Sequence, residues 1–255
     1  MTRASADAPV RLSAVIIARN EEANLPACLA SLAGLADEIV LVDSESSDRT
    51  PAIARAAGAR VATHAFDGFG AAKQRALDMA TGTWALSIDA DEVVTPALAD
   101  EMRRLVASEV EPNGFEVRRD VFFVGRHLRF GGMGNDWVLR LFRRTEGRFS
   151  ADRVHEHVEV RGRTARLRGS LEHHAYRTLT EHVEKMNRYT EMQAVLKTER
   201  GVRYRTWMWL RLPWEVFARL VLRLGVLDGT AGVLFATMSA YSAWLKYAKT
   251  WRPGA

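Results

Sequence analysis

The stretch Leu86-Ser87-Ile88-Asp89-Ala90-Asp91-Glu92 ends an apolar run in two aspartates separated by one residue. Because alternate side chains of an extended strand point the same way, Asp89 and Asp91 can face a common point. Carboxylate oxygens suit a hard divalent cation such as Mg²⁺ or Mn²⁺, and such a cation suits a diphosphate. An acidic turn at a strand end would show the same pattern, so the residues around the stretch decide its meaning.

Upstream of this stretch, short β-branched runs alternate with helical patterns. We expect strands over residues 12–18, 38–42, 60–63 and 84–88, and helices over residues 24–32, 50–57 and 71–80. The first helix has Asn24 as its candidate N-cap, with Pro26 in its first turn. Strands and helices in alternation predict an α/β fold, with a Rossmann-like, mostly parallel sheet flanked by helices on both faces.

Polar clusters follow three of these strands directly. They are Arg19-Asn20-Glu21, Asp43-Ser44 and the Asp89/Asp91 pair. Because ligands of open parallel sheets bind beyond the carboxyl ends of the strands, we expect these three clusters to form one site.

The regular alternation of strand and helix patterns ends near residue 114. We expect strands over residues 115–119, 121–124 and 138–142, a glycine-rich loop over 131–134, and helices over 180–199, from about Pro213 onward, and over 229–245. The residues Arg211, Glu215, Arg219 and Arg223 recur every four positions, which is typical of an amphipathic helix. We therefore divide the chain into a disordered leader (1–9), one α/β domain (10–200) and a helical extension (201–255).

Composition restricts the class of protein. Of the 255 residues, 47% are hydrophobic and 26% are charged, which is ordinary for a soluble globular chain. A single cysteine excludes an intramolecular disulfide and fits a reducing compartment. Residues 201–255 carry eight Lys or Arg and two acids, a local charge of +6, together with five tryptophans. We expect a cytoplasmic protein whose basic, Trp-rich extension associates with an anionic membrane surface.

The strand-end segments resemble a known family. The segments 15–22, 39–50 and 87–92 are similar to the family 2 inverting nucleotide-sugar glycosyltransferases, which have the GT-A fold. The bacterial lipopolysaccharide-core β-glucosyltransferases are the group in that family that the chain resembles most. Similarity continues through residues 153–156, 173–176 with 185–190, and 225–229, and so covers nearly the whole chain after the leader.

The resemblance implies roles for individual residues. Asp43 would accept a hydrogen bond from the base or ribose, Lys73 would face the phosphates, and Asp91 helped by Asp89 would hold Mg²⁺ or Mn²⁺. The implied nucleotide-sugar site comprises Arg19, Asn20, Glu21, Asp43, Ser44, Lys73 and Asp89. The implied reaction moves a hexose, glucose from UDP-glucose, onto a lipid-linked saccharide such as the lipopolysaccharide inner core.

Inversion at the sugar carbon requires one general base. We select Glu156, which lies between His155 and His157, with Asp136 as the alternative. His173 is either a third metal ligand or a residue that caps a strand. The histidine spacing fits no common zinc pattern.

Two other functions remain open at this point. The stretch Asp89–Val93 also fits the nucleophile motif of haloacid-dehalogenase-type phosphatases, although no close pair of aspartates follows downstream. The basic extension alone would suit a non-catalytic protein that binds a membrane surface, and we expect no nucleic-acid partner. Only the transferase hypothesis predicts metal-dependent binding of a nucleoside diphosphate.

Overall fold

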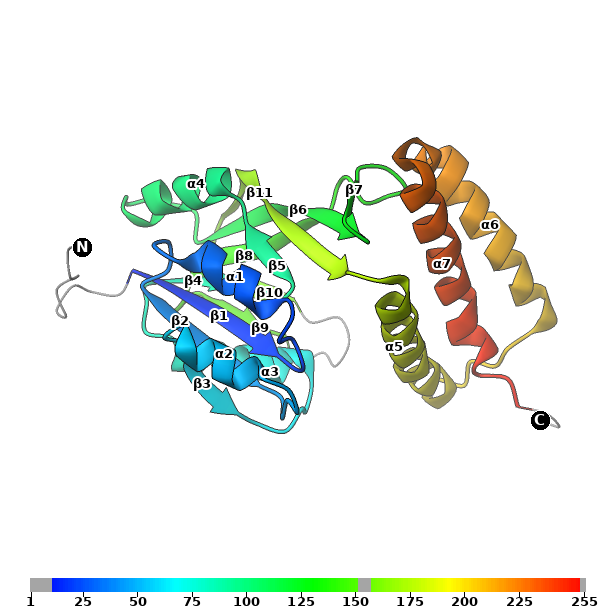
Figure 1. Cartoon of the computed structure of the whole chain (residues 1–255), viewed down its shortest axis with the longest axis horizontal. Coiled ribbons are helices and arrows are strands. Elements are labelled where there is room, and N and C mark those ends of the chain that lie inside the picture. The colour runs from blue at the N-terminus through cyan, green and yellow to red at the C-terminus, as the bar shows by residue number, and fades with distance from the viewer. Residues whose placement is uncertain (1–10, 151–156, 253–255) are drawn as a thin grey trace. The chain divides into compact units, whose positions relative to one another are not determined.

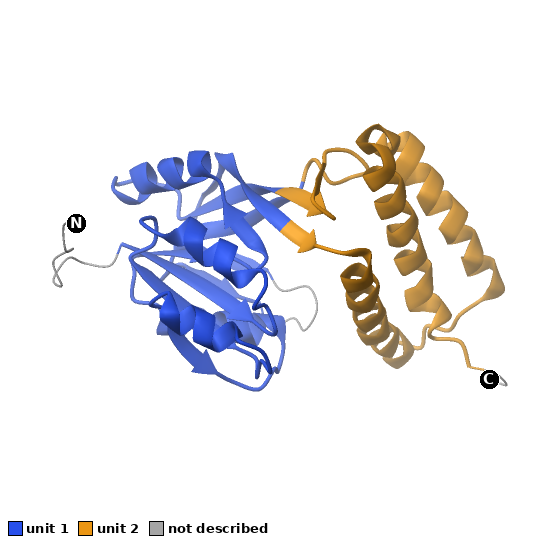
Figure 2. Cartoon of the chain, in the orientation of Figure 1, with its two compact units in different colours: residues 1–119, 136–173 blue, residues 120–135, 174–255 orange. Residues whose placement is uncertain are grey.

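A computed structural model describes residues 11–150 and 157–252. The chain forms two compact units, coloured separately in Figure 2. The sheet unit comprises residues 1–119 and 136–173, and the helical unit comprises residues 120–135 and 174–255. This division differs from the predicted boundary at residue 200, because α5 (Leu179–Glu199) packs against α7 (Gly229–Ala248) in the helical unit.

The sheet unit alternates strands and helices in its first half, as expected (Figure 1). Its elements are β1 (Leu12–Ala18), α1 (Leu25–Leu32), β2 (Glu38–Asp43), α2 (Thr50–Ala56), β3 (Arg60–Thr63), α3 (Phe69–Met79), β4 (Trp84–Ser87), β5 (Glu92–Val94), α4 (Pro96–Val106), β8 (Trp137–Arg143), β9 (Gly147–Phe149) and β10 (Val158–Val160). Two long strands, β6 (Gly114–Phe123) and β11 (Thr164–Tyr176), begin in the sheet unit and end in the helical unit.

The main sheet has the order β3-β2-β1-β4-β8-β6-β11-β5. The first four strands are parallel, β8 pairs antiparallel with β4 and β6, and β5 pairs antiparallel with β11. The register aligns Ala18 with Asp43, so β1 and β2 end level with each other. The predicted α/β class with a parallel sheet is confirmed for this half of the chain.

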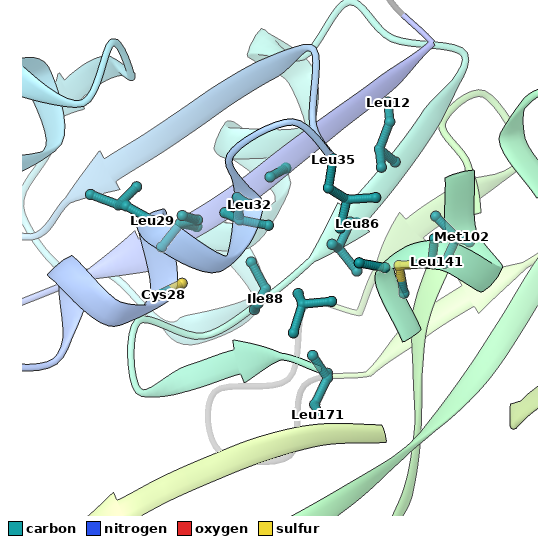
Figure 3. Close-up of a cluster of buried hydrophobic side chains, with 14 of the residues drawn as sticks. Leu12, Cys28, Leu29, Leu32, Leu35, Leu86, Ile88, Met102, Leu141 and Leu171 are labelled. Atoms are coloured by element: carbon teal, nitrogen blue, oxygen red, sulfur yellow. The ribbon is translucent and has the colours of Figure 1, made fainter. Parts of the chain in front are cut away.

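Alternation along β1 explains why helices cover both faces of the parallel strands. Leu12, Ala14 and Ile16 pack with α1 in the larger apolar core, part of which is shown in Figure 3. Val15 points to the opposite face and packs with Ala76 of α3. Strand β1 is therefore buried on both sides, as in doubly covered parallel sheets.

Two local predictions differ from the structure in detail. Asn24 is the N-cap residue of α1 with Pro26 in the first turn, as predicted, but its side chain makes no cap bond, and its amide donates to Oε2 of Glu21 at 2.8 Å. Strands were expected over residues 115–119 and 121–124, but residues 114–123 form the single strand β6, since neither Arg119 nor Asp120 interrupts the extended backbone.

The helical unit contains β7 (Arg126–Leu128), which pairs with the end of β6, and a series of helical segments. These are α5, η1 (Thr206–Leu210), α6 (Arg211–Phe217), the π-helical segment η2 (Ala218–Leu222), η3 (Gly225–Asp228) and α7. Its core joins Phe123, Tyr176, His182 and Phe235 edge to face or tilted, with ring centroids 4.1–6.4 Å apart.

Among the described helices, none alone has the length and apolar composition to cross a bilayer. The segments Thr206–Leu222 and Gly225–Ala248 meet that criterion only as a pair, and they bend by 76° at the break between them.

Candidate active site

The three polar clusters predicted from the sequence lie at the carboxyl ends of β1, β2 and β4. Hydrogen bonds join the first two clusters into one assembly. The backbone N–H of Asn20 donates to Oγ of Ser46 at 2.9 Å, and Ser47 N–H donates to Oδ1 of Asn20 at 2.8 Å. Asn20 and Glu45 both have φ of 56°, a left-handed backbone that is uncommon outside glycine. Such conformations persist where surrounding bonds fix the backbone, as they do here.

Asp43 is buried at the end of β2, with 1% of its surface exposed. Its Oδ2 accepts a hydrogen bond from Ser46 N–H at 3.1 Å. Its Oδ1 is also buried and has no hydrogen-bond partner among the described residues. A buried carboxylate oxygen without a donor is costly, so this atom suits an N–H or O–H group of a ligand.

Asp89 is held by two cations from different elements. Lys73 of α3 lies 3.0 Å from Oδ1, and Arg140 of β8 lies 2.6 Å from Oδ2. Burial would raise the pKa of Asp89, but the charges and hydrogen bonds of Arg140 and Lys73 outweigh burial and hold the pKa well below its usual range. The carboxyl group of Asp89 is therefore ionised, and each of its oxygens is paired with a cationic side chain.

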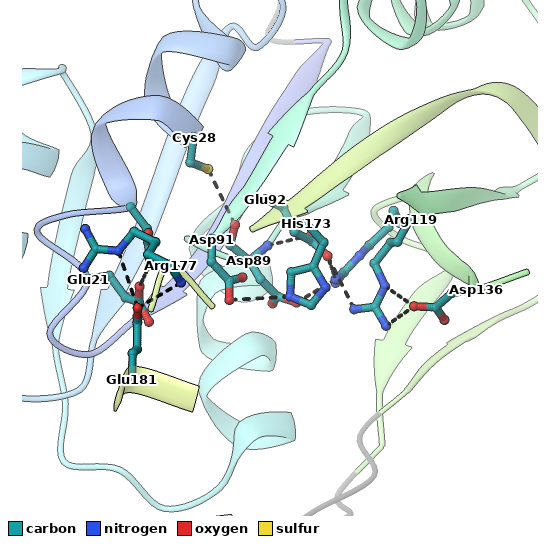
Figure 4. Close-up of polar contacts among 12 residues, drawn as sticks. Glu21, Cys28, Asp89, Asp91, Glu92, Arg119, Asp136, His173, Arg177 and Glu181 are labelled. Atoms are coloured by element: carbon teal, nitrogen blue, oxygen red, sulfur yellow. Dashed lines mark hydrogen bonds and ion pairs between the residues drawn. The ribbon is translucent and has the colours of Figure 1, made fainter. Parts of the chain in front are cut away.

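The second carboxylate of Arg140 is the fully buried Glu92, at 2.5 Å. Its Oε2 accepts from Asp89 N–H at 3.0 Å, which fixes the turn that carries both aspartates. Arg119 of β6 approaches Glu92 at 3.5 Å and binds Oδ2 of Asp136 through two nitrogens at 2.9 and 2.7 Å. Positive and negative side chains thus alternate along one line, part of which is shown in Figure 4: Lys73, Asp89, Arg140, Glu92, Arg119, Asp136. We call this line the charge ladder.

Asp91 lies beside the ladder and faces His173 of β11. Oδ2 of Asp91 and Nε2 of His173 are 3.5 Å apart, and both side chains are largely buried. Burial would lower the pKa of His173, but the hydrogen bond and charge of Asp91, together with the charge of Glu92, raise it above its ordinary value. The pairing of β11 with β5 aligns His173 with Glu92 and so delivers the imidazole to the aspartate turn.

The described residues contain no group of three or more His, Cys, Asp or Glu side chains arranged to hold a metal ion. The Asp91 and His173 pair offers one carboxylate and one imidazole, a donor set that fits Mn²⁺ or Mg²⁺ only if phosphate or water oxygens complete the coordination.

Other predicted site residues have different positions. Arg19 and Asn20 are exposed, Glu21 is partly exposed, and Ser44 is 5% exposed beside Asp43. Glu156 lies outside the described residues, so its predicted role as the base stays a prediction. Asp136 is described, and its ion pair with Arg119 engages the carboxylate.

Sequence reasoning missed Arg119 and Arg140 and gave Glu92 no role. One signal was present for Arg140, because it is a charged residue in the otherwise apolar alternation of residues 138–142. Its partners come from the turn after β4 and from β5. The position of β4 beside β8, and of β5 beside β11, is set by sheet order, which the sequence pattern does not specify.

The parallel sheet and the carboxylates at its strand ends define an α/β protein with an acidic ligand-binding edge, the general arrangement of nucleotide-binding enzymes. The chain belongs to glycosyl transferase family 2, whose model matches residues 13–175. It is therefore a glycosyltransferase, and the phosphatase and non-catalytic alternatives are wrong.

Individual relatives agree with this family. The chain is 34% identical to the lipopolysaccharide core biosynthesis glycosyltransferase LpsC of Rhizobium meliloti (strain 1021), over 94% of this chain and 92% of that protein. It is 25% identical to an uncharacterized glycosyltransferase, RT0209, of Rickettsia typhi, over 94% of this chain and 86% of that protein.

Among solved structures, the chain is similar to glucosyl-3-phosphoglycerate synthase from Mycobacterium tuberculosis, in a complex with Mn²⁺, UDP and glucosyl-3-phosphoglycerate. The identity is 27%, the TM-score is 0.38, and the similarity covers 43% of this chain and 44% of that chain.

Proposed function

We propose that the protein is a metal-dependent inverting hexosyltransferase. It transfers glucose from UDP-glucose to a lipid-linked saccharide such as the lipopolysaccharide inner core. The observation that carries the proposal is the placement of Asp43, with its unmatched buried oxygen, and of the Asp91 and His173 pair at the carboxyl ends of the same sheet. The acceptor class is supported by LpsC, a core biosynthesis glycosyltransferase that aligns with almost the whole chain.

The proposed roles follow the contacts. Oδ1 of Asp43 accepts a hydrogen bond from the uracil or ribose of the donor. Asp91 and His173 hold Mn²⁺ or Mg²⁺, which when bound neutralises the charge that develops on the leaving diphosphate. Asp89 is engaged by Lys73 and Arg140, so we propose that it positions the aspartate turn and leaves the metal to its neighbour.

We retain Glu156 as the general base that takes the proton from the acceptor hydroxyl. Asp136 is the second candidate, but its ion pair with Arg119 occupies one of its oxygens. A base must be free to accept a proton as the acceptor attacks, and this requirement favours Glu156.

A location at the inner face of the cytoplasmic membrane is part of the proposal. A lipid-linked acceptor lies in a bilayer, and residues 201–255 carry a net charge of +6 that suits anionic lipids.

Nucleotide binding tests the donor site. We expect UDP with Mn²⁺ to raise the unfolding temperature by several degrees, because a ligand at 100 times its Kd stabilises a fold by about 2.7 kcal/mol. ADP and GDP should have smaller effects. Asp91→Asn should remove the part of the shift that needs Mn²⁺, and Asp43→Asn should weaken the response to UDP. The matched control is Asp67→Asn, an exposed aspartate of the same unit that pairs with Arg75.

A response to UDP that is equal with and without Mn²⁺ would contradict the metal assignment, and a response to ADP alone would redirect the donor to an ADP-sugar. Glu156→Gln should keep the UDP response and lose transfer of glucose. Normal turnover in that variant would give the role of base to Asp136.

A further inference from the structure

The helical run Thr206–Leu222 has an exposed apolar face. Large apolar side chains recur along it at alternating spacings of three and four residues, which places them on one side of the helix, and Leu224 follows at the same spacing just beyond its end. Each is between 46% and 60% exposed: Trp207, Leu210, Trp214, Phe217, Val221 and Leu224. We call these six residues the outer stripe. No residue of η1, α6 or η2 is buried.

The polar face of the same run points inward. The guanidinium of Arg211 lies over the ring of Tyr247 of α7, 5.0 Å from its centroid. Arg219 pairs with Glu215 at 3.7 Å and donates to the carbonyl oxygen of Gly131 at 3.3 Å. The four-residue repeat of charges seen in the sequence is thus used for packing, with only Arg223 of that set exposed.

This arrangement inverts the polarity of an ordinary surface helix. A helix that packs on a water-soluble protein turns its apolar stripe inward and its charges outward. Single exposed apolar residues are common, but a continuous stripe that includes two half-exposed tryptophans marks an interaction surface.

The turn after the run continues the apolar surface. Val226 and Leu227 of η3 are 55% and 61% exposed at the bend between Thr206–Leu222 and Gly225–Ala248. Turns exposed to water are rich in Gly, Pro, Asn, Asp and Ser. Two large aliphatic side chains at this position therefore also indicate burial against a partner.

Charge identifies the partner. Residues 201–255 have a net charge of +6, so two copies of this surface would repel each other. Arg203, Arg205 and Arg223 are exposed in the same segment, and lipid phosphates complement them. Tryptophan also favours the boundary between lipid and water.

We propose that the outer stripe, with Val226 and Leu227, inserts into the interfacial layer of a lipid bilayer, and that the helices lie in the plane of that layer. This inference deepens the proposed membrane location, and it names apolar insertion as the main source of binding. Because Arg211 and Arg219 are turned inward, salt should weaken the binding only modestly.

Vesicle co-sedimentation of the full chain tests the proposal. We expect binding to pure phosphatidylcholine vesicles that persists in 0.5 M NaCl, and a several-fold gain when phosphatidylglycerol is added. The double substitution Trp214→Ser/Phe217→Ser should reduce binding at least tenfold on both kinds of vesicle. The control is Met192→Ser/Val195→Ser, two exposed apolar residues of α5 in the same unit, which should bind as the wild type does.

Three outcomes would overturn the proposal. They are an absence of binding to either vesicle, binding only to anionic vesicles that salt abolishes, and a stable dimer in solution that the Trp214/Phe217 variant dissociates. The stripe variant should retain the thermal response to UDP, because the donor site lies in the sheet unit. Retained UDP binding without vesicle binding would therefore refute the membrane surface alone, and the converse would refute the donor site alone.

Discussion

Arg140 forms ion pairs with two carboxylates, Asp89 and Glu92, and 7% of its side chain is exposed. Removing one partner of a buried ion pair leaves an uncompensated charge and costs about 3–5 kcal/mol. We therefore expect Arg140→Met to lower the free energy of unfolding by about 3 kcal/mol, measured by urea denaturation. UDP binding should weaken with it, since Asp89 and Asp91 share one turn.

The control for this substitution is Arg163→Met. Arg163 and its partner Glu111 are both about three-quarters exposed, so their ion pair contributes about 0–1 kcal/mol. Equal losses from the two variants would show that the charge ladder is no more than a set of surface contacts.

At the residue scale, the sequence was informative where a polar side chain follows an apolar strand. The placement of Asp43, Asp89 and Asp91 near strand ends could be predicted because the apolar runs before them mark β2 and β4. Arg119 and Arg140 could not, because their partners lie 17 to 51 residues away in the chain, across strand pairings that the local pattern does not encode. The position of these carboxylates at strand ends was therefore predictable, while the groups that hold them in place were not.

His182 of α5 is a buried polar side chain whose ring nitrogens lack hydrogen bonds within the described part of the chain. It is 5% exposed within the aromatic cluster of the helical unit, and neither ring nitrogen has a hydrogen-bond partner among the described residues. Burial, with a contribution from the charge of Lys185, lowers the pKa of His182 below its usual value.

A histidine whose pKa is lower in the fold binds more protons when unfolded. The stability that it permits is complete above the unfolded pKa of about 6.5 and is lost as the pH falls from there toward the folded pKa. We expect His182 to contribute a decline in wild-type stability between pH 7 and 5.5, opposite in sign to the contribution of His173, and His182→Phe to remove the contribution of His182. Urea unfolding at both pH values measures it.

The control is His64→Gln, an exposed histidine of the sheet unit. If His182→Phe keeps the full wild-type decline, another group causes the pH dependence.

At the element scale, β1 to β4, α1 to α3 and β8 begin and end within two residues of the predicted limits, whereas β5, α4, β9, β10 and β11 were not predicted. Periodicity also found α5 and α7. It could not predict which face of the helix containing Trp214 would be buried. Periodicity shows that a helix has an apolar and a polar face, but it does not show which of the two packs against the rest of the protein. Inward arginines become visible only with the contact between Arg211 and Tyr247.

At the scale of the whole molecule, each of the two units is built from two separate stretches of the chain, since residues 120–135 leave the sheet unit and residues 136–173 return to it. Strands β6 and β11 therefore supply the helical unit with Phe123 and Tyr176, while α7 supplies Phe235. A chain ending at residue 200 would keep the strand ends of the sheet unit but would lose α7, the partner of α5.

We expect the 1–200 fragment to bind UDP while α5 becomes the first site of limited proteolysis, because a helix without its packing partner opens at low cost. The full chain digested in parallel is the reference. Equal resistance of residues 179–199 in both would mean that α5 needs no support from α7.

Cys28 of α1 packs against the turn that carries Asp89 and Asp91. It is the only cysteine in the chain, it is fully buried in α1, and its Sγ lies 3.6 Å from the carbonyl oxygen of Asp89. Burial, aided by the nearby carboxylates, raises the pKa of this thiol far above its usual value, so the native fold withholds the reactive thiolate. A thiol-specific dye can react only when α1 separates from the aspartate turn. The rate of that reaction would therefore report how often α1 separates from the turn, without any introduced label.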